Sequence, residues 1–272
     1  MFLENGGNLI TDKEKTGLIH SVNVPGLRNW EELSRDDAAK IVDQYRWIYV
    51  NASLKGEYGA EDEATKLSNS LGRRPMVHVY LSRGVFDGTR NTYPGRFHAS
   101  MGALIESALE TKEQLLVTGR SYGVHQSLRA ACEFDDPAIL VLGIAPAFGA
   151  FGNQFSDNVK QYVKDVAETK CKYGMIASED DIFTWRSGGA AYKQKIGYRG
   201  DNDVGRAIEK NKANVHLEIL HGADHAPIDE YLRHGLVPAM QRCVSFFGMD
   251  SCVTDIVEGV EVNSDKDLQD PQ

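Results

Sequence analysis

A serine stands between two glycines in "GRSYG", Gly119 to Gly123, where a short apolar run passes into a sequence of helical character. A serine at the apex of such a strand-to-helix turn takes a strained backbone conformation, and the flanking glycines let strand and helix approach without Cβ clashes. Its hydroxyl would project beside the N-terminus of the following helix, which stabilises negative charge. This context predicts that Ser121 is a nucleophile.

Two alternative roles of the pentapeptide stay open. It could be a structural glycine-rich turn with no chemical role, or a loop that cradles phosphate. The phosphate loop is disfavoured, because the stretch has neither the G-K-[ST] ending of a P-loop nor the G-x-G-x-x-G of a dinucleotide site.

Two later stretches offer the partners that a nucleophilic serine needs, a base and an acid that orients the base. "SEDDIF" follows one expected strand, and "HGADHAP", His221 to Pro227, follows the next. The order serine, acid, histidine along the chain is the order that this kind of serine turn predicts. Asp224, inside the second stretch, is expected to bond to its own loop backbone.

The elements around these loops alternate between strands and helices. Several expected strands are nearly continuous apolar runs, which suits a parallel sheet covered on both faces. We therefore predict an α/β fold with a mostly parallel, doubly wound sheet. The expected strands are Gly17 to Val24, Met76 to Leu81, Gln114 to Thr118, Ala138 to Ala145, Lys172 to Ser178 and Val215 to Leu220. The expected helices are Arg35 to Val50 (capped by Ser34), Ala60 to Ser70, Ala99 to Glu110, Tyr122 to Ala131, Asn158 to Glu168, Val204 to Asn211 and Ile228 to Phe247.

The domain organisation is expected to be simple, because the sequence has no internal repeat and no low-complexity linker. Residues 1–249 are predicted to form one domain, of which residues 1–75 are an atypical N-terminal part. Residues 250–272 are rich in acids and poor in large apolar side chains, so we expect a mobile tail.

Composition excludes several classes of function. The net charge of −9 argues against nucleic-acid binding, which needs a basic face. No apolar run reaches the roughly 18 residues of a membrane span, and the first residues lack the pattern of a secretory signal. The four cysteines form no C-x-x-C pair, so neither a disulfide frame nor a zinc site is expected. We expect a cytoplasmic protein.

From about Met76 to Phe247 the chain resembles the α/β-hydrolase superfamily. "GADHAP" is similar to the histidine loop of the family, and "ASEDDIF" is similar to its acid turn. The resemblance implies that His225 is the base, with His221 a weaker competitor. It implies Asp180 as the acid; Asp181 is a close alternative and Glu179 a distant one.

The resemblance also implies an activity. We expect a serine hydrolase that cleaves a carboxylic ester or thioester through an acyl-enzyme, with no cofactor and no metal. Acyltransferase and peptidase activity use the same triad and stay open. Two further alternatives are a non-catalytic binding protein of this fold and a nucleotide-binding α/β protein. The expected partner is a small-molecule or acyl ester, and the sequence specifies neither its acyl chain nor an oligomeric state.

The oxyanion hole of such an enzyme is formed by backbone N–H groups. The family pattern implies one donor at Tyr122, directly after the serine. The second would come from the loop after Met76 to Leu81. Many family members carry His-Gly in this loop, whereas this chain carries Arg83-Gly84, so the second donor is expected at Val85, with Arg83 an alternative.

The substrate pocket has fewer sequence signals. Arg83 and Arg120 could bind a carboxylate or phosphate on the substrate, or they could be structural arginines. Phe148 follows another strand and could line an apolar pocket or belong to the core. Little chain separates Ser121 from Asp180, so the cap is expected to be small or absent, with Thr184 to Gly200 as a candidate lid.

Overall fold

The computed structural model describes residues 10–13, 19–23, 36, 38–39, 47–51, 60–71, 76–80, 93–110, 114–147, 155–181, 203–225 and 227–249. The helix cap expected at Ser34, the lid expected at Thr184 to Gly200 and the tail expected over residues 250–272 lie outside these residues. The predicted division into domains therefore stays a prediction.

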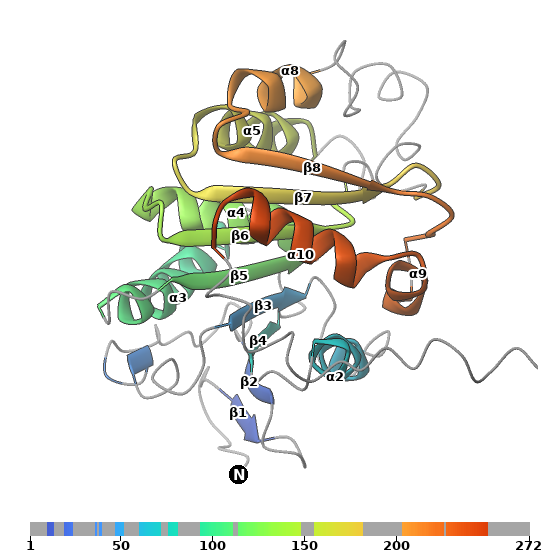
Figure 1. Cartoon of the computed structure of the whole chain (residues 1–272). Helices are drawn as coiled ribbons and strands as arrows, with labels where there is room; N and C mark the ends of the chain where they lie inside the picture. Colours follow the sequence, from blue (N-terminus) through green and yellow to red (C-terminus); the bar gives the residue numbers. More distant parts are fainter. Residues whose placement is uncertain are drawn as a thin grey trace, which may run out of the picture.

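One sheet runs through the described residues, with the strand order β1-β2-β4-β3-β5-β6-β7-β8 (Figure 1). Only β1 is antiparallel to its neighbour, and all other neighbouring strands are parallel, as the apolar strand sequences predicted. The strands are β1 (Ile10–Lys13), β2 (Ile19–Asn23), β3 (Trp47–Asn51), β4 (Met76–Tyr80), β5 (Leu115–Arg120), β6 (Ile139–Ile144), β7 (Lys172–Ser178) and β8 (Val215–Leu220).

Helices pack on both faces of this sheet (Figure 1). One face is covered by α3 (Tyr93–Leu109), α4 (Gly123–Phe134), α5 (Phe155–Glu168) and α8 (Asp203–Lys210). The other face is covered by α2 (Ala60–Ser70), α9 (Ile228–Arg233) and α10 (Leu236–Phe246). The predicted doubly wound α/β architecture is confirmed.

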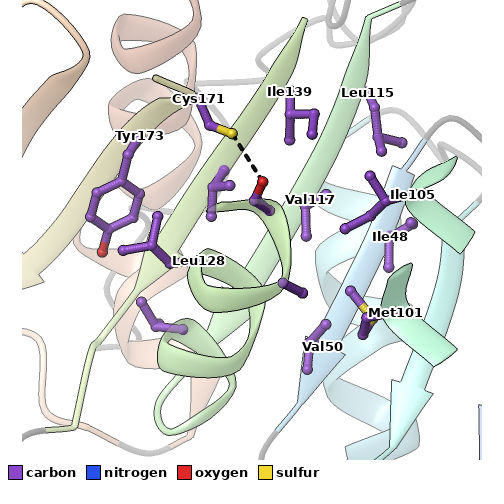
Figure 2. Close-up of a cluster of buried hydrophobic side chains, with 14 of the residues drawn as sticks. Ile48, Val50, Met101, Ile105, Leu115, Val117, Leu128, Ile139, Cys171 and Tyr173 are labelled. Carbon is purple, nitrogen blue, oxygen red and sulfur yellow. Dashed lines mark hydrogen bonds between the residues drawn. The ribbon is translucent and has the colours of Figure 1, made fainter. Parts of the chain in front are cut away.

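Alternate residues of each central strand supply two separate apolar cores. Leu115 and Val117 of β5 enter the core beneath α3 and α4, whereas Leu116 between them enters the core beneath α10. Figure 2 shows the first core, where Met101 of α3 and Leu128 of α4 meet the strand side chains. Because both faces are buried, a central strand needs apolar residues at every position, which explains the continuous apolar runs in the sequence.

Two helix predictions were wrong in part. The helix expected to reach Val50 cannot do so, because Trp47–Asn51 form β3, a wholly buried strand between β4 and β5. Aromatic and β-branched side chains suit this pleated, buried environment, and tertiary packing overrides the helical periodicity. The long last helix is instead two helices, α9 and α10, separated at Gly235, whose φ of 97° only glycine adopts readily.

Cysteines and possible metal ligands are dispersed. The described cysteines Cys132, Cys171 and Cys243 carry free thiols. Nowhere in the described part of the chain do three or more His, Cys, Asp or Glu side chains group so that they could hold a metal ion. No helix among the described residues is long and apolar enough to cross a membrane.

Candidate active site

Ser121 occupies a strained turn at the end of the central strand β5, immediately before α4. Its φ is 55°, in the left-handed region that costs a non-glycine residue about 1–2 kcal/mol. The turn is held by two backbone hydrogen bonds. Ser121 N–H donates to the Ile144 carbonyl at 3.0 Å, and Val124 N–H donates to the Ser121 carbonyl at 3.2 Å. The strained serine turn that the sequence predicted is therefore present.

The two glycines beside Ser121 are required by close packing. A Cβ at Gly119 would lie 2.7 Å from the Cα of Val124, inside van der Waals contact. A Cβ at Gly123 would overlap the carbonyl group of Val50 in β3. Strand β5, helix α4 and strand β3 can approach this closely only because both positions lack a side chain.

His225 lies against the serine. The Ser121 Oγ and the His225 Nε2 are 2.8 Å apart, although 104 positions separate the two residues in the chain. The His225 Nδ1 is 2.8 Å and 3.0 Å from the two carboxylate oxygens of Asp181, whose side chain is wholly buried. A carboxylate accepts the Nδ1 proton, so Nε2 is left to accept the proton of the serine hydroxyl.

The acid beside the histidine corrects our choice from the sequence. We predicted Asp180, but the Asp180 Oδ2 accepts the backbone N–H of Gly222 at 2.7 Å, and its neighbour Asp181 reaches the imidazole. The cause is the tight turn after β7, in which Asp181 N–H donates to the Ser178 carbonyl at 3.3 Å. Successive side chains of such a turn point in different directions, so only one of two adjacent aspartates can face His225.

Glu179 and His221, the weaker candidates for the acid and the base, lie next to each other. The Glu179 carboxylate is 3.3 Å from the His221 Nδ1, and the His221 side chain is 77% exposed. The hydrogen bonds that join the described Ser121, His225 and acid side chains involve Asp181 instead. Asp224 accepts the backbone N–H of His225 at 2.7 Å, the local loop bond that the sequence predicted for it.

Tyr231 is a residue of the site that the sequence did not reveal. Its hydroxyl donates to the Asp181 Oδ2 at 2.8 Å from helix α9. Burial, and then the negative charge of Asp181, raise the pKa of the Tyr231 hydroxyl well above its usual value, so it stays protonated and donates. Asp181 is thereby held by His225 on one side and by Tyr231 on the other. A tyrosine inside an amphipathic helix gives no sign of such a role.

Of the two roles that the sequence left open for Arg120, the structure favours the structural one. Arg120 was a candidate for binding the substrate, but its side chain is 5% exposed and its Nη1 is 2.7 Å from the Glu63 Oε1. Its Nη2 donates to the backbone carbonyl of His225. The guanidinium is engaged inside the protein, so Arg120 is a structural arginine rather than a substrate-binding one.

The remaining predicted residues concern the oxyanion hole and the pocket. Tyr122 follows the serine directly and occupies the N-cap position of α4. Amide groups at a helix start have no carbonyl partner in the preceding helical turn, which makes this a suitable place for an oxyanion donor. Val85, Arg83 and Phe148 lie outside the described residues. Their roles, and that of the Tyr122 amide, stay predictions.

His125 lies one helical turn after the serine and was not singled out from the sequence. Burial lowers its pKa to about 4, so the ring is neutral at neutral pH. Its Nε2 lies 3.0 Å from the Ala147 carbonyl and donates to it. Its ring lies 4.6 Å from that of Tyr162 and 5.7 Å from that of Tyr122. A neutral histidine thus packs the start of α4 against the end of β6.

Together, the sheet order, the helices on both faces and the serine turn between β5 and α4 define the α/β-hydrolase fold. The described part of the chain therefore has the fold that its sequence resemblance implied. No family model and no curated protein sequence matches it.

Several solved structures are similar to the chain. A proposed dienelactone hydrolase from Klebsiella pneumoniae is 13% identical, with a TM-score of 0.48 over 75% of this chain and 86% of the other. A serine hydrolase from Cycloclasticus zankles is 12% identical, with a TM-score of 0.46 over 76% and 92%. A monoacylglycerol lipase from Paleococcus ferrophilus is 14% identical, with a TM-score of 0.44 over 74% and 94%.

Proposed function

We propose that the protein is a serine hydrolase that cleaves a carboxylic ester or thioester through an acyl-enzyme. Two consecutive hydrogen-bond contacts support this proposal. The Ser121 Oγ is 2.8 Å from the His225 Nε2, and the His225 Nδ1 is 2.8 Å from the Asp181 Oδ2. A nucleophile, a base and an orienting acid in this arrangement are what acyl transfer needs.

In the first half of the proposed reaction, the Ser121 oxygen attacks the carbonyl carbon of the ester. The His225 Nε2 takes the hydroxyl proton as the new bond forms. Asp181 keeps the imidazole in the tautomer that accepts this proton, and its charge stabilises the imidazolium that results. His225 then gives the proton to the leaving alcohol or thiol, and the acyl group stays on Ser121.

The negative oxygen of the tetrahedral intermediate needs hydrogen-bond donors. We assign one to the backbone N–H of Tyr122 and the other to that of Val85. The N-terminus of α4, which begins at Gly123, adds its positive end to the same region. In the second half, a water molecule attacks the acyl carbon while His225 takes its proton. The bond between the acyl carbon and the Ser121 Oγ then breaks, His225 returns the proton to the Ser121 Oγ, and the carboxylic acid leaves.

A binding protein without catalysis accounts less well for the same geometry. The left-handed conformation of Ser121 carries a conformational cost that a binding pocket would not require. Aligning a serine, a histidine and a buried aspartate has no evident purpose for binding alone. Peptidase and acyltransferase activity share this geometry and differ only in the leaving group or the acceptor.

The proposal is tested by intact-mass spectrometry after incubation with a fluorophosphonate, which reacts with activated serines. The wild type is expected to gain one adduct, and Ser121→Ala to gain none. His225→Ala is expected to react at least about 10³-fold more slowly, because the hydroxyl loses its base. His221→Ala is the matched control and should react like the wild type, since His221 is exposed and pairs with Glu179.

Two results would overturn the proposal. One is a folded wild type that gains no adduct, and the other is an adduct that persists in Ser121→Ala. If the wild type reacts, a series of p-nitrophenyl esters and thioesters of increasing acyl length would then separate ester from thioester preference.

A further inference from the structure

A buried ion pair lies directly beside the serine and the histidine. The Arg120 Nη1 is 2.7 Å from the Glu63 Oε1, and the two side chains are only 5% and 9% exposed. Glu63 belongs to helix α2, whereas Arg120 is the last residue of β5 and the residue before Ser121. The pair therefore joins the serine turn to a helix on one face of the sheet.

Glu63 is itself held in place by a second group of contacts. Its Oε2 accepts a hydrogen bond from the Asn51 side-chain amide at 2.5 Å, and the Tyr49 hydroxyl lies 3.4 Å from the same oxygen. Asn51 ends β3 and lies beside Arg120 in the strand register. With both carboxylate oxygens engaged, Glu63 offers the guanidinium one defined position.

The other end of the guanidinium reaches the histidine loop. The Arg120 Nη2 donates to the backbone carbonyl of His225. His225 thus has two separate anchors, since Asp181 holds its ring and Arg120 holds its main chain. The planar guanidinium can bind two partners in fixed directions at once, which a lysine ammonium does less well.

Helix α2 is also tied to the element that follows the histidine loop. Lys66 of α2 forms an ion pair of 2.6 Å with Asp229 of α9. These two helices contact each other, and they lie near each other in Figure 1. The support for Glu63 and the support for the His225 loop are therefore parts of one layer.

We propose that the Arg120–Glu63 pair is a positioning device that sets the placement of His225 relative to Ser121. This rests on the proposed function, in which His225 must accept the Ser121 proton. Arg120 is covalently next to the nucleophile and hydrogen-bonded to the main chain of the base, so one side chain fixes both. A buried ion pair stabilises a fold little compared with apolar packing of the same volume. Stability alone therefore does not explain the pair, whereas the hydrogen bond from Arg120 to the His225 carbonyl gives it a specific role.

The experiment compares two double variants. Arg120→Met with Glu63→Gln removes the positioning pair and leaves no unpaired buried charge. Arg129→Met with Asp165→Asn is the matched control, because it removes a partly buried ion pair of 3.0 Å elsewhere in the fold. Each variant is assayed for the rate of fluorophosphonate labelling and, by NMR, for the chemical shift and pH titration of the His225 ring.

The positioning variant is expected to label about 10- to 100-fold more slowly, as small misplacements of catalytic groups do. The His225 resonances should shift in the same variant. The control should keep the wild-type rate and the wild-type His225 resonances, even if both variants lose the same stability.

Wild-type labelling and unchanged His225 resonances in the positioning variant would overturn the proposal. If that variant does not fold, Arg120→Lys is tested instead. Slower labelling together with a shifted His225 signal would support the proposal, and a wild-type rate with an unshifted signal would overturn it. If the wild type is not labelled at all, the proposed function fails, and the His225 resonances alone decide whether Arg120 positions this residue.

Discussion

The serine turn and the histidine loop deliver their side chains to one point by different means. Ser121 is placed by local backbone geometry: a left-handed φ of 55° and two glycines, Gly119 and Gly123, whose missing side chains allow close packing. His225 is placed by side chains from distant parts of the chain. Arg120 holds its carbonyl, and Asp181 holds its ring.

This difference predicts how each part fails. Substitutions in the serine turn should lower the stability of the fold, because strand β3, strand β5 and helix α4 meet there. Damage to the contacts of His225 acts on reactivity, because the loop can stay folded while the imidazole loses its orientation. Stability and labelling rate should therefore separate the two regions.

The largest expected effect concerns the two adjacent aspartates. Asp181→Asn should lower the fluorophosphonate labelling rate about 10⁴-fold, because an amide stabilises the wrong tautomer of His225. Asp180→Asn should change the rate by about twofold, since Asp180 only accepts the Gly222 amide at the surface. Equal effects of the two substitutions would contradict the assignment of Asp181. The measurement is the second-order labelling rate of each variant at one pH.

The next effect tests the packing of the serine turn. Gly123→Ala should lower the free energy of unfolding by about 3 kcal/mol, because the new methyl group overlaps the Val50 carbonyl in the buried sheet. Urea unfolding measures this change. Gly102→Ala is the control: its methyl group would lie 3.7 Å from the Phe134 ring in ordinary contact, and alanine favours the helix. A comparable loss of stability in Gly102→Ala would contradict the claim that close packing at the serine turn specifically requires glycine.

A smaller effect concerns the buried His125 and the dependence of stability on pH. Burial lowers the pKa of His125 to about 4 in the folded protein, whereas in the unfolded chain it is about 6.5. Below pH 6.5 the unfolded state binds this proton and the folded state does not, so stability falls as the pH falls. The loss from His125 should reach about 2 kcal/mol at pH 5, and it should stop growing below pH 4.

The check is urea unfolding at pH 7.5 and pH 5. His125→Gln should lose less stability between the two values than the wild type does. His221→Gln, at an exposed position, should lose as much as the wild type. An unchanged pH response in His125→Gln would show that His125 is not held neutral by burial.

The smallest effect tests the strain at the serine itself. Ser121→Gly should be about 1 kcal/mol more stable than Ser121→Ala, because only glycine adopts a φ of 55° without a steric cost. The order should reverse at Ser245, an exposed position in α10, where alanine favours the helix over glycine. Free energies of unfolding for the four variants decide whether the backbone at residue 121 is strained.

The same contrast explains what the sequence predicted. The serine turn was predictable, because its glycines and its strand-to-helix context lie within a few residues of Ser121. The histidine of the later loop was reached through a resemblance to known histidine loops. The parallel sheet and most of its strands followed from apolar runs that are buried on both faces.

The wrong or undecided predictions have two causes. Some depend on partners far away in the sequence, and one depends on the direction in which each of two adjacent side chains points. Asp180 and Asp181 have the same chemistry, and only the turn after β7 decides which of them faces His225. The sequence could not decide between a substrate-binding and a structural Arg120, because its partner Glu63 lies in a helix far away in the chain. Strand β3 was taken for the end of a helix, since its burial between β4 and β5 is a property of the assembled sheet.

The long separation between Ser121 and His225 also has a consequence for the order of synthesis. Chains fold from the N-terminus as they leave the ribosome, so β5, the serine turn and α4 can form early. Ser121 can then have its final backbone conformation before His225 has been synthesised. His225 comes into place only when its loop packs against Arg120 and Asp181. On the proposed function, a nascent chain would therefore carry the nucleophile without its base until the segment that contains His225 has docked.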